Sequence, residues 1–361
     1  VKIDLLLEVT EAALREKDIA VCDAFMEFTR AQKTFYSTAG SEITQTIITS
    51  GGGYNATAED DHEVHRRSYP DGHHGLFSTA GFEIFDDMRM LHSVERISDE
   101  ARSLLMAKEC PAKKTDIIID GAQMALQIHE SCGHPAELDR VLGSELGFAG
   151  GSFLSLDKHG IYRYGSPQVN LYADPRDPGG AGSYCYDDEG VRAQRVDLVR
   201  DGVFAGYLNS RESAGATGMR PNGSMRAEGW DSGPLVRMSN ISIEPGTPTL
   251  AELIADTKDG LFLSTNRSWS IDDQRLNFQF GTEIAWEIKN GRIRHVYKNP
   301  VYYGMTPVFW SACDAVCSKA DWRMWGLNSC AKGEPLQTAS VGHGASPARF
   351  RGVSVGVMKE G

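Results

Sequence analysis

The sequence lacks any long apolar run. No stretch of its 361 residues approaches the 18 or so consecutive apolar residues that a membrane-spanning helix needs. Positive charge is also scarce, because 37 Lys and Arg stand against 49 Asp and Glu, which gives a formal net charge of −12. Nucleic acids and anionic membranes are bound through clustered Lys and Arg. These deficits predict a soluble enzyme that binds neither nucleic acid nor membrane.

Cysteine is sparse and irregularly spaced. Secreted disulfide scaffolds are shorter and richer in cysteine, whereas seven cysteines are spread over this chain. We therefore expect reduced thiols and a cytoplasmic protein. Cys313 and Cys317 are four residues apart, but no second cysteine or histidine pair lies nearby to complete a metal site, so two packed thiols are favoured. The seven cysteines are Cys22, Cys110, Cys132, Cys185, Cys313, Cys317 and Cys330.

The N-terminal part of the chain has the pattern of a helix packed on an antiparallel sheet. Residues 3–17 place apolar side chains at helical intervals. From Val21 to about Arg67 the pattern changes to the alternation that is typical of strands. We expect a meander of three strands, separated at Ala31-Gln32 and Ala39-Gly40 and ending at Gly51-Gly52-Gly53.

Gly51-Gly52-Gly53 resembles a phosphate-binding loop only in its glycines. No Gly-Lys-Ser/Thr follows, and no helix is predicted to begin there. A flexible strand end is the favoured interpretation.

A histidine-rich patch follows at residues 60–75. His62, His65, His73 and His74 lie here beside two aspartates. The segment is rich in turn-forming residues, which do not give ligands a fixed geometry. We favour a solvated loop, at the rim of an active-site cleft, over a metal site.

Residues 82–109 are predicted to form a long amphipathic helix, interrupted between His92 and Ser98, where the second part is capped. Pro111 and two lysines then mark a linker. At 361 residues the chain is long enough for about two domains. We place an α+β domain at 1–112.

Residues 113–361 are expected to form a β-rich domain with a closed or sandwiched sheet. The strand 116–120 leads through Gly121 into a short helix, and later strands recur at steady spacing with a helix at 250–256. Asp201-Gly202 and Asn290-Gly291 predict hairpin turns.

The short helix carries the motif His-Glu-x-x-x-His. A hydrolytic metal site needs two or three nitrogen or sulfur ligands, an open position for water, and a carboxylate that takes the proton of that water. His129 and His134 supply two ligands and Glu130 supplies the carboxylate. We interpret this segment, residues 121–139, as a metal-dependent hydrolase site.

The spacing of the two histidines is unusual. In His-Glu-x-x-His the histidines are four apart and share one helical face. Five apart, the imidazoles on a straight helix would point about 140° away from each other. Gly133 and Pro135 flank His134, and this predicts a helix break that lets the second ligand turn back toward the first.

Neighbouring side chains allow alternatives. Glu137 and Asp139 can orient a ligating imidazole, since such histidines usually donate their other N–H to a carboxylate or carbonyl. They are equally well explained as surface charges. Cys132 is predicted to be a small core residue that points away from His129.

Downstream, a series of short segments follows HESCGH in a fixed order. Together with HESCGH, these segments resemble the catalytic TldD subunit of the TldD/PmbA (TldD/TldE) metalloprotease family. The resemblance runs from about residue 113 to the C-terminus. The segments are Asp187-Asp188-Glu189-Gly190, Ala193-Gln194-Arg195, Asp201-Gly202-Val203, Gly206-Tyr207-Leu208, Arg237-Met238-Ser239-Asn240, Pro245-Gly246, Cys330-Ala331-Lys332-Gly333, and Gly342 with Gly344.

The resemblance implies a zinc-dependent peptidase, either an endopeptidase or a processive one, that acts on unfolded or flexible peptides. It implies one zinc ion held by His129, His134 and Cys330, the last on a loop, with Glu130 activating a metal-bound water. Two departures occur. Cys-Ala-Lys replaces the family's common Cys-Gly-Lys, and His343 stands at a position that is often apolar, where it is a candidate contact for substrate or oxyanion.

The resemblance also implies assembly, as a homodimer or as a heterodimer with a metal-free paralogue, and it implies further residues ahead of Val1. The alternative function is a non-catalytic peptide-binding or scaffold subunit of such a complex. Glu130 separates the two hypotheses, because peptide binding needs no general base.

Overall fold

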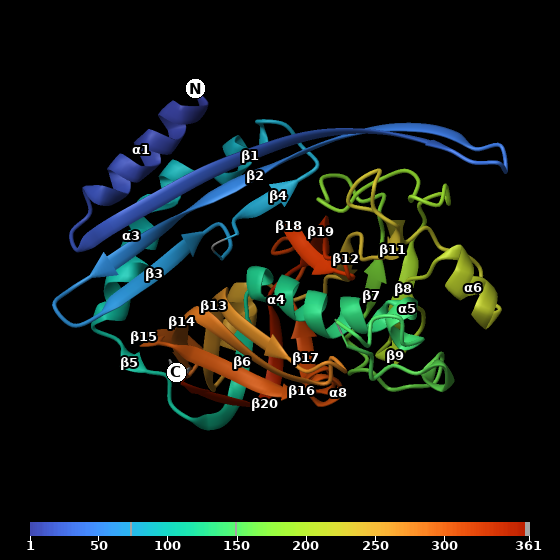
Figure 1. Cartoon of the computed structure of the whole chain (residues 1–361). Helices are drawn as coiled ribbons and strands as arrows, with labels where there is room; N and C mark the ends of the chain where they lie inside the picture. The colour runs from blue at the N-terminus through green and yellow to red at the C-terminus, as the bar shows by residue number, and fades with distance from the viewer. Residues whose placement is uncertain (73, 149, 358–361) are drawn as a thin grey trace.

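The computed structural model describes residues 1–72, 74–148 and 150–357. Figure 1 shows an N-terminal helix-and-sheet layer above a β-rich body, with the helix α4 lying between them. The α+β class predicted from the sequence is confirmed. None of the helices in the described ranges is both long and apolar enough to cross a membrane.

The N-terminal layer is an antiparallel sheet covered by helices. Its strands are β1 (Ile19–Tyr36), β2 (Glu42–Glu59), β3 (Val64–Tyr69) and β4 (Leu76–Ser78). The helices α1 (Lys2–Leu14), α2 (Ile84–Met88) and α3 (Met90–Leu105) bury their apolar faces against it, in a core that includes Val9, Tyr54 and Ile97. The predicted helix over the sheet is therefore confirmed.

Of the three predicted breaks in the meander, the one at Ala39-Gly40 is confirmed as the turn between β1 and β2, and the other two are wrong. β1 runs unbroken through Ala31-Gln32 and pairs with β2 along almost its whole length, so the two strands form one long ribbon (Figure 1). Gly51, Gly52 and Gly53 lie inside β2 and are buried. A Cβ on Gly52 would lie 2.2 Å from the Phe25 carbonyl oxygen, so these glycines permit close packing and are no flexible strand end.

The histidine-rich patch and the long helix also differ from expectation. His65 is buried in β3, its Nε2 2.9 Å from Glu63 Oε2, whereas His62 is exposed and His74 lies in a turn. His73 lies outside the described residues. The helix predicted at 82–109 divides at Arg89, which has a left-handed φ of 50°, and continues unbroken from His92 to Ser98.

The C-terminal body is built on a closed barrel. Five strands pair in sequence around the barrel, and the first pairs with the last to close the ring. In order, they are β13 (Asp259–Ile271), β6 (Lys113–Ile119), β20 (Ala348–Val357), β16 (Pro300–Met305) and β14 (Asn277–Lys289). The closed sheet is confirmed. β15 (Arg292–Lys298) and β5 (Lys108–Glu109) extend it from β14, and β17 (Cys313–Val316) pairs with β20.

Asp201-Gly202 and Asn290-Gly291 form the predicted tight turns, with positive φ at all four residues.

Smaller elements surround the barrel. These elements are α5 (Leu138–Val141), a 3-10 turn (Leu156–Lys158), β7 (Leu171–Ala173), β8 (Val196–Arg200), β9 (Val203–Phe204), α6 (Arg211–Thr217), β10 (Met225–Arg226), β11 (Leu235–Val236), β12 (Ile241–Ile243), α7 (Leu250–Ala255) and α8 (Thr306–Ser311).

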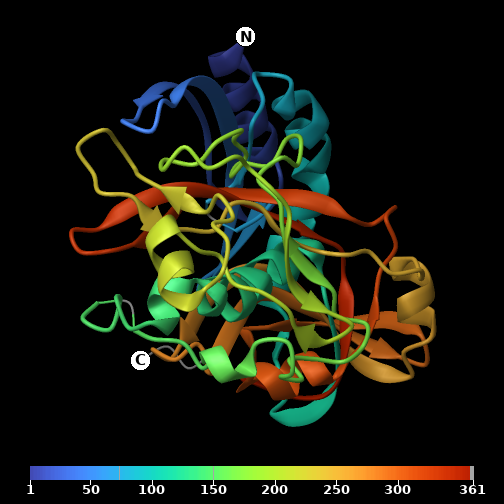
Figure 2. The same ribbon diagram turned by 90° about the vertical axis from the view of Figure 1, so that its right-hand side faces the viewer.

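The hairpin of β18 (Arg323–Lys332) and β19 (Gln337–Ala345) joins the two parts of the molecule. Figure 2 shows it in red, running between the N-terminal sheet and the barrel. β18 contacts β4, while β19 contacts α4 and β12. Cys330 and His343, on these two strands, are thereby brought against α4 and the turns that follow it.

Candidate metal centre

The motif histidines lie at the end of a helix that is buried on nearly all sides. α4 (Gly121–Ile128) begins at Asp120, whose side chain accepts a hydrogen bond of 2.8 Å from the backbone N–H of Gln123. This is the N-cap that an aspartate before a helix predicts. Met124 and Ile128 pack in the core of the barrel domain.

After Ile128 the helix widens into a single π turn, His129–Gly133, and then tightens into a 3-10 turn, His134–Ala136. The backbone N–H of His134 donates to the carbonyl of His129, which is an i→i+5 bond. The predicted break is thus a change of helical pitch. The two imidazoles lie one turn apart, with ring centroids 4.8 Å from each other.

A ladder of buried polar groups fixes this turn against the barrel. The Tyr302 hydroxyl accepts from Gln123 Nε2 at 2.8 Å and donates to Gln127 Oε1 at 3.0 Å. Gln127 Nε2 and Trp310 Nε1 then donate to the Ser131 hydroxyl at 3.0 and 2.9 Å. Because buried polar groups are costly unless they are paired, this ladder specifies one placement of the π turn.

His129, His134 and Cys330 meet in the interior. Their candidate ligand atoms all lie within 4.8 Å of one another, and Cys330 Sγ lies 3.9 Å from His134 Nε2. All three residues are buried. The sequence placed Cys330 on a loop, but it lies within strand β18, where Arg237 donates a hydrogen bond to its carbonyl oxygen. Paired backbone holds the thiol more rigidly than a loop would.

Each histidine has a polar partner at its Nδ1 atom. His134 Nδ1 lies 3.0 Å from Glu137 Oε2, and His129 Nδ1 lies 2.9 Å from His343 Nε2. Glu137 is fully buried, so its orienting position is observed and a surface charge is excluded. The Nδ1 atoms are engaged, and the Nε2 atoms remain as the ligand atoms.

Glu137 is itself held by cations. Lys332 Nζ lies 3.3 Å from Glu137 Oε2 and 2.8 Å from Asp139 Oδ1, and Arg140 Nε lies 3.6 Å from the same Glu137 oxygen. Burial alone would raise the pKa of Glu137, but Lys332, His134 and Arg140 lower it far below its ordinary value. Glu137 is therefore a carboxylate, which accepts the Nδ1 proton of His134.

The pKa values of the three candidate ligands are shifted in the direction that metal binding favours. Burial lowers the pKa of both His129 and His134, which favours the neutral imidazole. Burial would raise the pKa of the Cys330 thiol, yet the nearby His134 and Arg237 outweigh it and lower that pKa below 9.0. Neutral imidazole and thiolate are the forms that bind zinc.

The donor set also fits zinc in size. Tetrahedral zinc bonds of about 2.0–2.3 Å place nitrogen and sulfur ligands roughly 3.5 Å apart. The Sγ to Nε2 separation of 3.9 Å and the 4.8 Å limit for the whole group need only a small contraction. Three protein ligands match the number that catalytic zinc sites use, which leaves a fourth position for water.

Glu130 is buried next to these ligands and forms an ion pair with an arginine. Arg275 Nη1 donates to Glu130 Oε2 at 2.8 Å, from the turn between β13 and β14. The Thr306 hydroxyl holds this turn by donating to the Arg275 carbonyl oxygen at 2.8 Å. This contact with Arg275 fixes the orientation of the carboxylate.

Other sequence candidates lie away from this group. Cys132 packs in the core beside Tyr164, as predicted. In the described ranges, His129, His134 and Cys330 form the one group of side chains that could hold a metal ion, and His62 and His65 do not belong to it. His343 is fully buried behind His129, and its contact with substrate stays a prediction.

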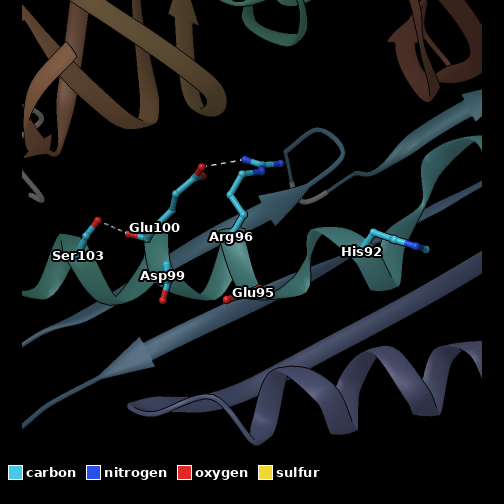
Figure 3. Close-up of a pocket in the computed structure, with 6 residues that line it drawn as sticks. All are labelled: His92, Glu95, Arg96, Asp99, Glu100 and Ser103. Atoms are coloured by element: carbon cyan, nitrogen blue, oxygen red, sulfur yellow. Dashed lines mark hydrogen bonds and ion pairs between the residues drawn. The ribbon is translucent and has the colours of Figure 1, made fainter. Parts of the chain in front are cut away.

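A shallow cavity of about 420 Å³ lies along α3, far in sequence from the metal motif. Figure 3 shows its six lining side chains, all on one helix, with Arg96 paired to Glu100 at 2.7 Å. Arg67 also pairs with Glu100. These charges satisfy one another, so the cavity is a solvated helix face.

The roles of three cations were not predicted from the sequence. Lys332 follows Cys330 by two residues, so strand alternation could have placed it on the same side of β18. Arg237 was noted only as part of a family segment. Arg275 carries no local signal, because its contact with Glu130 spans 145 residues.

Comparison with known proteins gives a consistent family. Residues 1–107 match the model of the PmbA/TldA metallopeptidase central domain, and residues 112–357 match that of the PmbA/TldA metallopeptidase C-terminal domain. A metalloprotease of Methanocaldococcus jannaschii is 33% identical over 297 residues, which cover 82% of this chain and 61% of that protein. The zinc metalloprotease TldD homolog of Saccharolobus solfataricus is 25% identical, over 76% of this chain and 58% of that protein.

Solved structures agree on the fold. A crystal structure from Thermotoga maritima superposes with a TM-score of 0.79 at 18% identity, over 98% of this chain and 73% of that one. TldE from Thermococcus kodakarensis gives a TM-score of 0.74 at 15% identity, over 98% and 73%. The chain spans about three fifths of the length of the curated relatives it matches.

Proposed function

Because the chain belongs to the PmbA/TldD metallopeptidase family, we propose that it is a zinc-dependent peptidase with one zinc held by His129, His134 and Cys330. The observation that carries this proposal is the convergence of the three ligand atoms within 4.8 Å, with both Nδ1 atoms engaged elsewhere.

The chemistry that zinc supplies when bound is Lewis acidity toward a carbonyl oxygen and toward water. Glu130 is the general base, which accepts the proton of the attacking water and later delivers a proton to the leaving amine. Arg275 holds this carboxylate in a fixed orientation before substrate arrives. Glu137 and His343 hold the ligating imidazoles in place.

The proposed substrates are unfolded or flexible peptides. Residues 42–49 of β2 pair with β1 on one side, and within the described ranges no strand pairs with their other edge. This edge lines a cavity of about 900 Å³, whose opposite wall includes Pro175–Pro178 and Ser183–Tyr186. An extended peptide can add to a free strand edge through its backbone, which tolerates many side chains.

Domain boundaries and assembly belong to the same proposal. We place an α+β domain at 1–112 and the metallopeptidase domain at 113–361. The chain pairs with a second copy or with a metal-free paralogous subunit, in the cytoplasm. TldE from Thermococcus kodakarensis shares the fold.

Cleavage of an unfolded casein-like substrate tests the proposal. The wild type and Glu95→Gln, a change on the exposed face of α3, are expected to cleave it. Glu130→Gln is expected to bind zinc and to lose cleavage by at least about 100-fold. The alternative is a non-catalytic binding or scaffold subunit. It would be favoured if the wild type binds zinc and peptide but does not cleave the peptide, whether the chain is alone or mixed with a TldE-type subunit.

A further inference from the structure

His343 lies directly behind one of the two candidate ligands. It belongs to β19, it is fully buried, and its Nε2 lies 2.9 Å from His129 Nδ1. Its other nitrogen, Nδ1, lies 3.2 Å from the carbonyl oxygen of Ile241. The ring stands nearly perpendicular to that of His129, at 81°.

The flanking glycines allow this close approach. A Cβ on Gly342 would lie 2.4 Å from the Asn240 side chain, and one on Gly344 would lie 2.0 Å from the Trp322 ring. β19 can therefore pack tightly against β12, and the alternation of the strand directs His343 toward His129.

The contacts of His343 fix where each proton lies. A carbonyl oxygen accepts hydrogen bonds and cannot donate one, so the proton between Ile241 and His343 belongs to His343 Nδ1. In the neutral imidazole the Nε2 of His343 is then an acceptor. The proton between the two rings must belong to His129 Nδ1. His129 is left with an unprotonated Nε2, which is the atom that a metal needs.

The reverse arrangement is unfavourable. A proton on His343 Nε2 would leave its Nδ1 lone pair facing the Ile241 carbonyl oxygen at 3.2 Å, with no proton between two acceptors. It would also make His129 Nδ1 an acceptor and place the His129 proton on Nε2. In that state His129 could not bind a metal.

We propose that His343 is a positioning residue that holds His129 in the Nδ1–H tautomer, through a relay from the Ile241 carbonyl to the metal site. The proposal rests on the proposed zinc site. It assigns His343 a role other than contact with substrate. It also makes the two ligands unlike, because His134 is oriented by the anionic Glu137 and His129 by a neutral imidazole.

The tautomer can be observed without metal or activity. In the metal-free protein labelled with ¹⁵N, long-range ¹H–¹⁵N correlation spectra distinguish Nδ1–H from Nε2–H imidazoles. The wild type is expected to give the Nδ1–H pattern for His129. A Nε2–H pattern for His129 in the folded wild type would overturn the proposal.

Substitutions test the consequence for metal binding. His343→Leu cannot accept the His129 proton, and loss of such an outer partner typically weakens metal affinity about 10- to 100-fold. His343→Gln can donate from its amide to Ile241 and accept from His129, so it is expected to restore most of the affinity. His295→Leu removes an exposed histidine on β15 and serves as the matched control.

Zinc affinity is measured by competition with a chromophoric chelator, after circular dichroism has confirmed folding. If leucine prevents folding, His343→Met takes its place. Wild-type affinity in the folded leucine or methionine variant would overturn the proposal, as would a glutamine variant no better than leucine. Absence of zinc binding by the wild type would instead contradict the proposed function, so the two failures are distinct.

Discussion

The backbone N–H of His134 donates to the carbonyl of His129, five residues earlier, and this one bond makes the unusual motif spacing usable. In an α-helix the corresponding bond joins residues four apart. One π turn adds a residue between the histidines without leaving the helix. The ring centroids of the two imidazoles are then 4.8 Å apart, and both imidazoles lie close to the Cys330 side chain.

Gly133 is required for this turn. A Cβ at this position would lie 2.0 Å from Met238 Sδ and 3.2 Å from Ile241 Cδ1. Gly133→Ala is expected to lower the free energy of unfolding by about 1–3 kcal/mol through overpacking and to reduce zinc content. Chemical denaturation and elemental analysis check both effects. Gly215→Ala, in the helix α6 with open space around the new methyl group, should be neutral or stabilising.

Lys332 neutralises the buried carboxylates behind His134. Its side chain is fully buried, with Nζ within 3.3 Å of both Glu137 and Asp139. Lys332→Met leaves these charges without that partner and is expected to cost about 3–5 kcal/mol of unfolding free energy. The control, Lys289→Met, breaks a half-exposed pair with Asp259, which solvent screens, and should change stability little. Equal effects of the two changes in chemical denaturation would argue against a buried charge network.

Arg275 orients the proposed general base. Arg275→Met removes the donor at 2.8 Å from Glu130, and a displaced catalytic group can lose about 100-fold in rate. We expect kcat for peptide cleavage to fall by this order while zinc content is unchanged, and Arg275→Lys to be less affected. Arg294→Met, at an exposed position of β15, is the control. Loss of zinc from the Arg275→Met variant would contradict a role confined to Glu130.

Asp71 makes stability depend on pH. Burial raises the pKa of Asp71 from 3.8 to about 7. A raised pKa means that the folded state binds the proton more tightly, so this stabilisation is full below pH 3.8 and is lost as the pH rises through 7. Relative to Asp71→Asn, the wild type is expected to lose up to about 4 kcal/mol between pH 4 and pH 7.5. Parallel denaturation curves at both pH values would contradict this.

Local sequence patterns predicted the parts of this molecule that local physics determines. The helix 3–17, the Asp-Gly and Asn-Gly turns and the strand leading into the motif helix all follow from periodicity and turn chemistry. The prediction of a flexible strand end at Gly51–Gly53 was wrong because glycine in a strand can permit close packing as well as flexibility. The decisive neighbours, Phe25 and Phe77, are distant in sequence.

The site was predictable to the extent that its residues share a motif. His129, Glu130 and His134 are adjacent in sequence, and Cys330 was assigned through family resemblance. The partners of these residues were harder to predict, because Arg275 and His343 are 145 and 214 residues away in sequence from the side chains that they contact. A π turn also has no strong propensity signal, so the sequence indicated that the helix must change at Gly133 and Pro135 without indicating how.

Elemental analysis of zinc per chain determines whether His129, His134 and Cys330 hold a zinc ion. The proteins compared are the wild type, Cys330→Ala, and Cys132→Ala, which alters a buried thiol that belongs to the core. Circular dichroism confirms that each variant is folded.

We expect about one zinc per chain in the wild type and in Cys132→Ala, and none in Cys330→Ala. Zinc retained at the wild-type level by folded Cys330→Ala, or no zinc in the wild type after exposure to the ion, would contradict a zinc site at these three residues.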